Sequence, residues 1–164
     1  MKKLALEVPS AVQIILYTLN KAGYEAYIVG GCVRDAIMGR RPNDWDVTTS
    51  ATPNTVKNIF PKTYDTGLKH GTVTVRINNE SYEVTTYRTE GEYRDYRRPS
   101  SVEFVKDIAI DLSRRDFTIN SIAYHPKEGF VDPYLGIEDI NRGLLRAVGK
   151  AEERFTEDAL RILR

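Results

Sequence analysis

Two aspartates separated by one residue, Asp44 and Asp46, are the first candidates for a functional site in this 164-residue sequence. In a β-strand, residues two apart point to the same face, so both carboxylates project together while Trp45 and Val47 face the core. Converging carboxylates raise each other's pKa unless a cation neutralises them, and their hard oxygen atoms favour Mg²⁺. Glu83, on a predicted neighbouring strand, would complete a site for two ions. Taken alone, Asp-x-Asp is a weak pattern that also occurs at solvated strand ends.

A glycine pair, Gly30 and Gly31, lies where an apolar strand pattern changes to a helical one. Glycine allows close backbone approach, and the N–H groups at a helix start favour phosphate, so this turn is a candidate triphosphate site. The pair does not form the G-x-G-x-x-G pattern of dinucleotide-binding folds, and a lone Gly-Gly is also common in plain turns. Arg34 follows in the first helical turn, where a phosphate contact and a structural pair with Asp35 are both open interpretations.

The elements that must position these residues follow from hydrophobic periodicity, and in the first part of the chain helices alternate with strands. An amphipathic helix begins near Ser10 and ends before Gly23. Thr52 as N-cap and Pro53 at the first helical position mark a second helix, which Pro61 stops. Between these helices we expect a strand over 24–29 running into the glycine turn, a short helix over 33–39 and a strand starting at Trp45.

From Gly71 the apolar period changes to two, which predicts a β-hairpin with strands near 73–77 and 82–87. Residues 88–101 carry charge and tyrosine without an apolar period, so they are predicted to form a mobile loop. The remaining expected elements are a strand over 102–105, a helix over 111–124, a strand over 144–149 and a helix capped by Thr156.

Composition limits the class of protein. The net charge is +1, so any nucleic-acid contact must come from local patches. The single cysteine, Cys32, is expected in the core; it excludes an internal disulfide and fits a reducing, cytoplasmic compartment. No apolar run approaches the length of a membrane span, and neither Cys32 nor the two histidines has metal-ligand spacing. The last helix reaches Arg164 without a stop signal, which predicts a fragment of a longer protein.

Five motifs occur in an order that resembles the class II tRNA nucleotidyltransferases, the CCA-adding enzymes: "GGCVRDAIMGRRPNDWDVTTSATP", "LKHGTVTV", "YEVTTYR", "RRDFTINSIAY" and "EDALRILR". The resemblance runs from about Ala26 to the last residue. It implies an α+β fold, a polymerase-β-like nucleotidyltransferase head with a mixed, mostly antiparallel sheet flanked by helices. The head would span residues 1–148, and residues 149–164 would start a helical neck. By this resemblance, the sequence would lack the body and tail domains of the family.

The same resemblance implies roles for individual residues. The three carboxylates match the metal ligands of the family, and Arg115, Asp116 and Asn120 match the segment that contacts ribose and triphosphate. Asp116 and Asn120 are four apart and would share one helix face; without the resemblance, the arginines of this motif would be interpreted as a solvated basic face. Asp139 and Gly143 match the hinge between head and neck.

The last motif carries a pair that can read a nucleotide base. Asp158 and Arg161 are three apart on the expected helix, so a hydrogen-bond acceptor lies beside a donor. Cytosine and adenine both present an exocyclic amine donor next to a ring-nitrogen acceptor, and uracil and guanine reverse that order. One fixed pair can therefore select CTP and ATP. The alternative is an ordinary intrahelical ion pair.

The expected function is metal-dependent nucleotidyl transfer from CTP and ATP to the 3′ end of tRNA, with two Mg²⁺ ions and no membrane partner. A bacterial poly(A) polymerase would carry a basic-aromatic strand in place of "GLKHGTV". A CC-adding enzyme would have a shortened loop where this chain has "TEGEYRDYRRPSSVEF", whereas an A-adding enzyme remains an alternative. A nucleotide-binding module without turnover would not require the three carboxylates. The oligomeric state is left open.

Overall fold

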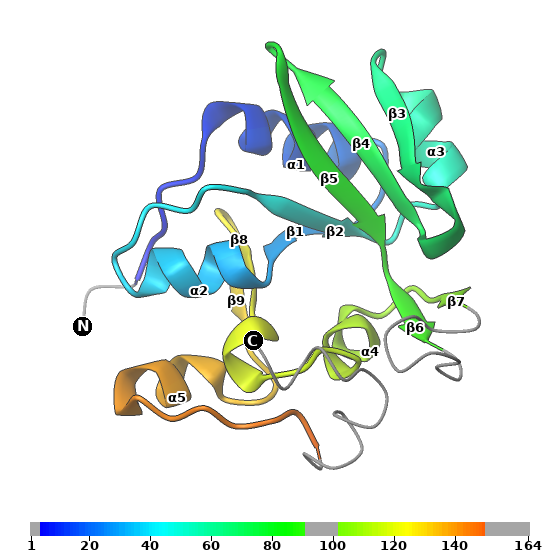
Figure 1. Cartoon of the computed structure of the whole chain (residues 1–164). Helices are drawn as coiled ribbons and strands as arrows, with labels where there is room; N and C mark the ends of the chain where they lie inside the picture. Colours follow the sequence, from blue (N-terminus) through cyan, green and yellow to red (C-terminus); the bar gives the residue numbers. More distant parts are fainter. Residues whose placement is uncertain (1–3, 91–101, 150–164) are drawn as a thin grey trace.

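The structure of the chain is a computed structural model that describes residues 4–90 and 102–149. Its helices are α1 (Ser10–Lys21), α2 (Gly31–Ile37), α3 (Pro53–Ile59), α4 (Ile108–Ser113) and α5 (Gly136–Arg142), with 3₁₀ turns η1 (Leu68–His70) and η2 (Thr118–Asn120). Its strands are β1 (Ala26–Val29), β2 (Asp46–Thr49), β3 (Thr63–Gly67), β4 (Thr72–Ile77), β5 (Glu80–Thr86), β6 (Arg88–Glu90), β7 (Val102–Phe104), β8 (Ala123–His125) and β9 (Gly129–Val131). Figure 1 shows their arrangement.

Seven strands form one sheet in the order β3-β4-β5-β2-β1-β8-β9. The β2–β5 pair is parallel, and the other pairs of this sheet are antiparallel. The predicted α+β fold with a mixed, mostly antiparallel sheet is therefore confirmed. Because β3 and β4 are interposed in sequence between β2 and β5, residues far apart in the chain meet at the centre of the sheet.

Apolar side chains pack on both faces of this sheet. On one face, α1 and α3 cover Ile28, Val47 and Val84, and α1 presents the buried stripe expected of an amphipathic helix (Figure 1). On the other face, Tyr27 and Tyr87 join Ile108 and Leu112 of α4 in a second cluster. The strand period of two sends neighbouring residues to opposite faces, so Val47 enters the first cluster while Asp46 faces the side of α4.

The predicted elements of the first sixty residues are confirmed, with small shifts in their ends. The Thr52 hydroxyl accepts a hydrogen bond from the backbone N–H of Thr55, with Pro53 at the first helical position. Helix α2 begins at Gly31, before the predicted start at residue 33. The predicted hairpin is β4–β5, whose turn uses Asn78 and Asn79 at φ 51° and 64°. Asparagine tolerates this left-handed conformation, which fits a two-residue hairpin turn.

Two strands before residue 91, β3 and β6, were not predicted. Strand β3 is at the edge of the sheet, and its exposed Tyr64, Asp65 and Thr66 give no apolar alternation. Strand β6 lies inside the expected loop over 88–101, because Arg88–Glu90 pairs with the predicted strand β7. The rest of that expected loop, residues 91–101, is outside the described residues.

The helix predicted over 111–124 is wrong. Helix α4 ends at Ser113, Thr118–Asn120 is a 3₁₀ turn, and Ala123–His125 is a strand. The Asp116 carboxylate accepts the backbone N–H of Phe117 at 2.7 Å, and the backbone N–H of Thr118 donates to the carbonyl of Arg146. These bonds replace the i to i−4 bonds that a continuous helix would need.

The C-terminal part of the described chain also differs from expectation. The strand predicted over 144–149 is reduced to a single bridge between Phe117 and Ala147. The β8–β9 hairpin and α5 were not predicted; Asp132 starts α5 by accepting the backbone N–H groups of Gly136 and Ile137. The helix expected after Thr156 is outside the described residues, so the domain boundary at residue 148 stays a prediction. Within residues 4–90 and 102–149, no helix is long and apolar enough to cross a membrane.

Candidate active site

The three predicted carboxylates lie around one cavity of about 380 Å³, which Trp45, Thr74 and Ser81 also line. Asp46 is the first residue of β2, and the parallel register pairs it with Glu83 of β5. Asp44 lies in the segment before β2 and not within the strand as expected, but it lines the same cavity. The predicted position of Glu83 on a strand next to that of Asp46 is therefore confirmed, and the grouping of the three acids as a site stays a prediction.

The electrostatics of this cavity are unfavourable for a set of bare carboxylates. Burial is the largest cause of the raised pKa of Asp46, followed by the negative charge of Glu83; Arg115 opposes the shift, and Asp44 adds to it. A hard divalent cation would relieve this repulsion, and all three donor groups are oxygen ligands of the kind that Mg²⁺ prefers. In the described residues, no three His, Cys, Asp or Glu side chains are gathered closely enough to hold a metal ion. The role of the three acids as ligands stays a prediction.

The glycine turn lies between β1 and α2, as predicted. Gly30 has φ 83° and ψ −139°, a conformation that other residues rarely adopt, and its carbonyl accepts the backbone N–H groups of Val33 and Arg34. A Cβ atom at Gly30 would be 3.3 Å from Nη1 of Arg115. Because Gly30 has no side chain, the space between the turn and the Arg115 guanidinium is left unfilled.

Arg34 and Asn120 connect α2 to η2 across this turn. Arg34 donates to Asp35 at 2.9 Å and to Oδ1 of Asn120 at 2.7 Å. Asn120 in turn donates from Nδ2 to the Asp116 carboxylate at 3.2 Å. The predicted shared helix face of Asp116 and Asn120 is wrong, because a 3₁₀ turn replaces the helix, but the two side chains still meet. Arg34 thus makes the structural pair with Asp35 and also contacts Asn120, a predicted nucleotide-binding residue.

Asp111 is a buried acid that sequence reasoning missed. It has no exposed surface, and its two carboxylate oxygens accept hydrogen bonds from the backbone N–H of Arg88 and from Thr48, Arg114 and Arg115. Its spacing of three and four residues from Arg114 and Arg115, within the segment that was predicted as a helix, was an available signal. Burial lowers the pKa of Arg115, the Arg114 charge lowers it further, and Asp111 opposes both.

The predicted hinge residues lie on α5. Asp139 is buried; it accepts two hydrogen bonds from the Arg146 guanidinium, at 3.0 and 3.1 Å, and one from the Thr118 hydroxyl. Gly143 ends α5 at φ 64°. These contacts fix α5 to η2, and movement at this position stays a prediction.

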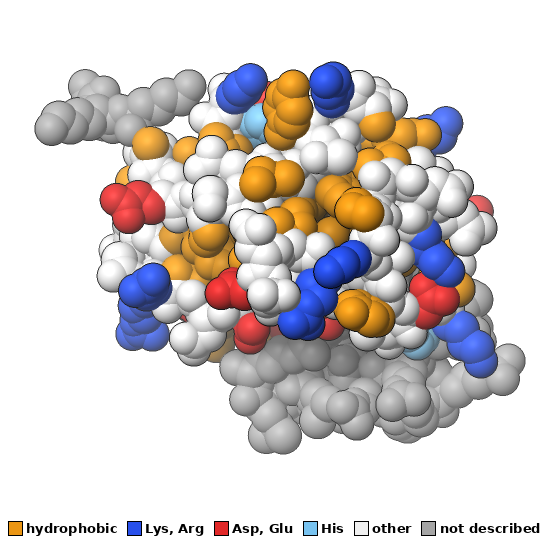
Figure 2. Space-filling view, turned by 90° about the horizontal axis from the view of Figure 1, so that it is seen from above, with side chains coloured by type: hydrophobic (Ala, Val, Ile, Leu, Met, Phe, Trp, Pro, Cys, Tyr) orange, Lys and Arg blue, Asp and Glu red, His pale blue; other side chains and the backbone are white. Residues whose placement is uncertain are grey.

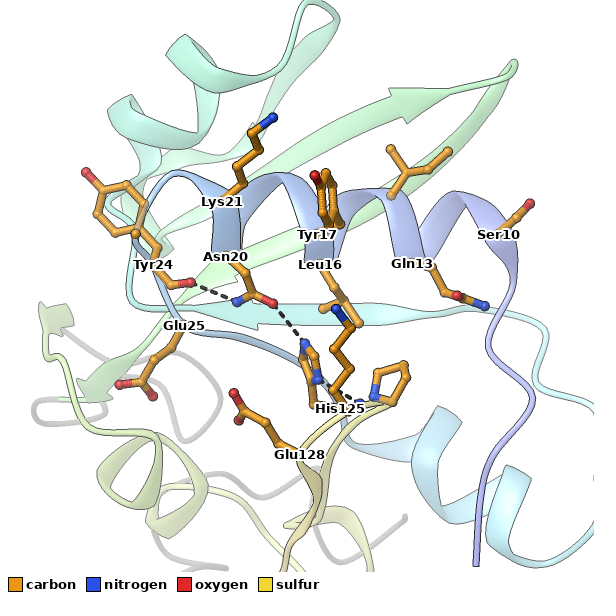
Figure 3. Close-up of a pocket in the computed structure, with 14 residues that line it drawn as sticks. Ser10, Gln13, Leu16, Tyr17, Asn20, Lys21, Tyr24, Glu25, His125 and Glu128 are labelled. Carbon is orange, nitrogen blue, oxygen red and sulfur yellow. Dashed lines mark hydrogen bonds between the residues drawn. The ribbon is translucent and has the colours of Figure 1, made fainter.

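A second hollow, about 980 Å³, lies between α1 and the β8–β9 hairpin (Figure 3) and shares no lining residue with the carboxylate cavity. His125 lies here: Nε2 contacts the Asn20 side-chain oxygen at 2.8 Å, and Nδ1 accepts the backbone N–H of Lys127. Both ring nitrogens are satisfied, so His125 has a structural role. Cys32 is also structural, as predicted, because burial raises the pKa of its thiol to about 11.

The environment of His125 predicts an acid-sensitive contribution to stability. Burial lowers its pKa, and the smaller effects of Glu128 and Lys127 oppose each other. Because the folded pKa is below the unfolded value, the neutral ring stabilises the fold at neutral pH, and this contribution is lost as the pH falls through the folded pKa. The Tm should fall between about pH 7 and about pH 5, and His125→Gln should show a smaller fall. His70→Gln is the control, and equal falls in wild type and His125→Gln would contradict the prediction.

Charged groups are mixed on the face of the molecule that Figure 2 shows. On the face shown in Figure 2, Lys and Arg side chains are interspersed with Asp and Glu side chains, and apolar side chains lie between them. This agrees with the net charge of +1. With this net charge, phosphate contacts are expected from individual arginines near the site.

The mixed sheet, with carboxylates on the adjacent strands β2 and β5, defines an α+β head domain of the nucleotidyltransferase fold class. Residues 26–146 match the family described as "Poly A polymerase head domain", and the chain belongs to that family. The resemblance found in the ordered motifs is thereby confirmed.

Curated relatives and a solved structure agree with this assignment. The chain is 54% identical over 158 residues to the CCA-adding enzyme of Lactobacillus johnsonii, covering 96% of this chain and 40% of that protein. It is 57% identical over 150 residues to the CCA-adding enzyme of Listeria monocytogenes, covering 92% and 38%. The Bacillus stearothermophilus CCA-adding enzyme in complex with CTP superposes with a TM-score of 0.85 at 48% identity, covering 93% and 36%. The chain thus spans about two fifths of the length of these relatives.

Proposed function

We propose that the chain is the catalytic head of a CCA-adding nucleotidyltransferase, which transfers nucleotides from CTP and ATP to the 3′ end of tRNA. The observation that carries this proposal is the parallel register of β2 and β5, which sets Asp46 opposite Glu83 with Asp44 in the same cavity. About half of the residues are identical to those of relatives that are named CCA-adding enzymes.

Asp44, Asp46 and Glu83 would hold the metal, and the raised pKa of Asp46 supports this assignment because a cation would relieve the repulsion between these acids. When bound, Mg²⁺ would supply Lewis-acid activation of the attacking 3′-hydroxyl and charge neutralisation at the leaving pyrophosphate, with two ions as the expected number.

The side chains of this chain would contribute mainly binding and orientation. Arg115 at the glycine turn, with Arg34 on α2, would bind the triphosphate, and Gly30 and Gly31 would let it approach the backbone. Asp116 and Asn120, already joined by a hydrogen bond, would orient the ribose. The tRNA hydroxyl would then attack the α-phosphorus in line as pyrophosphate leaves, with proximity as the main source of rate.

The test is to incubate the full-length gene product with Mg²⁺, a tRNA that lacks its CCA end, and the NTPs supplied singly and together. Addition of two C and one A residues is the expected result. Addition of A alone, and only to a tRNA ending in CC, would identify an A-adding enzyme, and long A tails would identify a poly(A) polymerase. Nucleotide binding without product would indicate a binding module.

Nucleotide selection is proposed to depend on Asp158 and Arg161, which are outside the described residues. Exchanging them in the Asp158→Arg, Arg161→Asp double variant reverses donor and acceptor without changing net charge. The kcat/KM for CTP and ATP should fall about 10-fold to 100-fold while UTP or GTP gains relative to them, since each mismatched hydrogen bond costs about 1–3 kcal/mol. Measuring kcat/KM for all four NTPs decides the matter, because a uniform loss would show that the pair is only structural.

A further inference from the structure

Asp111 is fixed from several sides at the back of the site. One carboxylate oxygen accepts the backbone N–H of Arg88 at 3.0 Å and Nε of Arg114 at 3.4 Å. The other accepts the Thr48 hydroxyl at 3.5 Å and Nη2 of Arg115 at 3.4 Å. Its partners thus come from β6, from β2 and from the two residues that follow α4, so the carboxylate has little freedom to move.

Arg115 is hydrogen-bonded through its side chain to this acid. In the described chain, its only side-chain hydrogen bond is the one to Asp111, and its buried Nε atom has no partner. Its Nη1 atom lies against the glycine turn, 3.3 Å from where a Cβ of Gly30 would be. The guanidinium is therefore held at one end by Asp111 and presents the other end to the turn.

Asp46 is a second acid that attracts the Arg115 guanidinium. Its electrostatic interaction with Arg115 is favourable, which places the two side chains within range of each other. An arginine released from Asp111 would find Asp46 as an opposite charge, and an ion pair there would occupy a carboxylate needed in the cavity. Arg115 would then leave the glycine turn, and Asp46 would no longer be available as a carboxylate in the cavity.

We propose that Asp111 is a positioning residue that holds Arg115 at the glycine turn, where its guanidinium meets the triphosphate of the incoming nucleotide instead of pairing with Asp46. The proposal rests on the assignment of Arg115 to nucleotide binding under the proposed function. Asp111 itself does not touch the nucleotide. It prevents Arg115 from taking other positions, so less conformational entropy is lost when the nucleotide binds.

The test is a double-variant cycle on ATP binding by this chain, measured by calorimetry in Mg²⁺ buffer. Asp111→Asn keeps an acceptor for the Arg88 N–H but removes the charge that holds Arg115. It should weaken ATP binding about tenfold in the wild-type background, and less than about twofold when Arg115 is already replaced by Lys. Thr48→Val is the control: it removes another contact of Asp111, so it should lower the Tm while leaving ATP affinity within about twofold.

The outcomes separate the inference from the function it rests on. If Arg115→Lys binds ATP as wild type does, Arg115 is not a nucleotide ligand, and the proposed site is wrong. If Arg115→Lys is impaired but Asp111→Asn binds normally, or loses the same factor in both backgrounds, the positioning role is wrong. Should Asp111→Asn not fold, Asp111→Glu, which retains the charge but displaces the carboxylate by one methylene, must show the same dependence on Arg115 for the proposal to stand.

Discussion

Asp46→Asn is expected to reduce nucleotidyl transfer by about a thousandfold in the full-length protein while the Tm does not fall. The carboxylate is one of three around the cavity and faces Glu83 across the parallel β2–β5 pair. Removing its charge removes a proposed metal ligand, whereas an amide of the same shape preserves the packing. Single-turnover rates with CTP and a trimmed tRNA, measured beside thermal melts, provide the comparison.

The direction of the pKa shift of Asp46 agrees with this expectation for the Tm. The pKa of Asp46 is raised in the fold, so the ionised group at neutral pH opposes folding, and a neutral side chain relieves that cost. Mg²⁺ should raise the Tm of the wild type more than that of Asp46→Asn. The control is Asp65→Asn on the exposed edge strand β3, which should keep both activity and the Mg²⁺ response. Transfer near the wild-type rate by Asp46→Asn would refute the assignment.

The carboxylate cavity could be predicted because it depends on a local rule. The strand period of two places Asp46 opposite in direction to Val47, and the same alternation in the hairpin exposes Glu83. That the two strands are neighbours is a tertiary fact, which the structure supplies through the parallel register. Asp44 lies before the strand and not within it, but it still lines the cavity because the chain runs along this cavity as it enters β2.

The segment 111–124 could not be predicted because its helical spacing is coincidental. Leu112 packs in the cluster beneath α4, whereas Ile122 packs in the cluster on the opposite face of the sheet. One helix cannot present residues to both faces, so the chain must change direction between them. The bond from Thr118 to the Arg146 carbonyl, which secures this change, joins residues that no local window compares. The same limit hid two of the partners of Asp111, Thr48 and Arg88, which are distant from it in sequence.

Gly30→Ala is expected to weaken ATP binding by about tenfold or more and to cost about 1–3 kcal/mol of folding free energy. Two independent effects act at this position. The backbone has φ 83° and ψ −139°, which strains any residue with a Cβ atom, and that atom would be 3.3 Å from Nη1 of Arg115. The guanidinium has little room to yield because Asp111 holds its other end. Calorimetric titration of ATP and denaturant melts measure the two effects separately.

Alanine variants of two other glycines distinguish the effect of backbone strain from the effect of the contact with Arg115. Gly39 has φ 75°, and no atom lies within 4 Å of the place that a Cβ atom would take, so Gly39→Ala should cost stability without changing ATP affinity. At Gly31 the nearest atom is the flexible end of Arg34 at 3.4 Å and the residue is helical, so Gly31→Ala should change stability by less than about 1 kcal/mol. If Gly30→Ala lost stability to the same extent as Gly39→Ala but bound ATP normally, the turn would be a strained connection and not a nucleotide site. Loss of ATP binding in Gly30→Ala but not in Gly39→Ala is the result expected if the Arg115 guanidinium must lie against an open glycine turn.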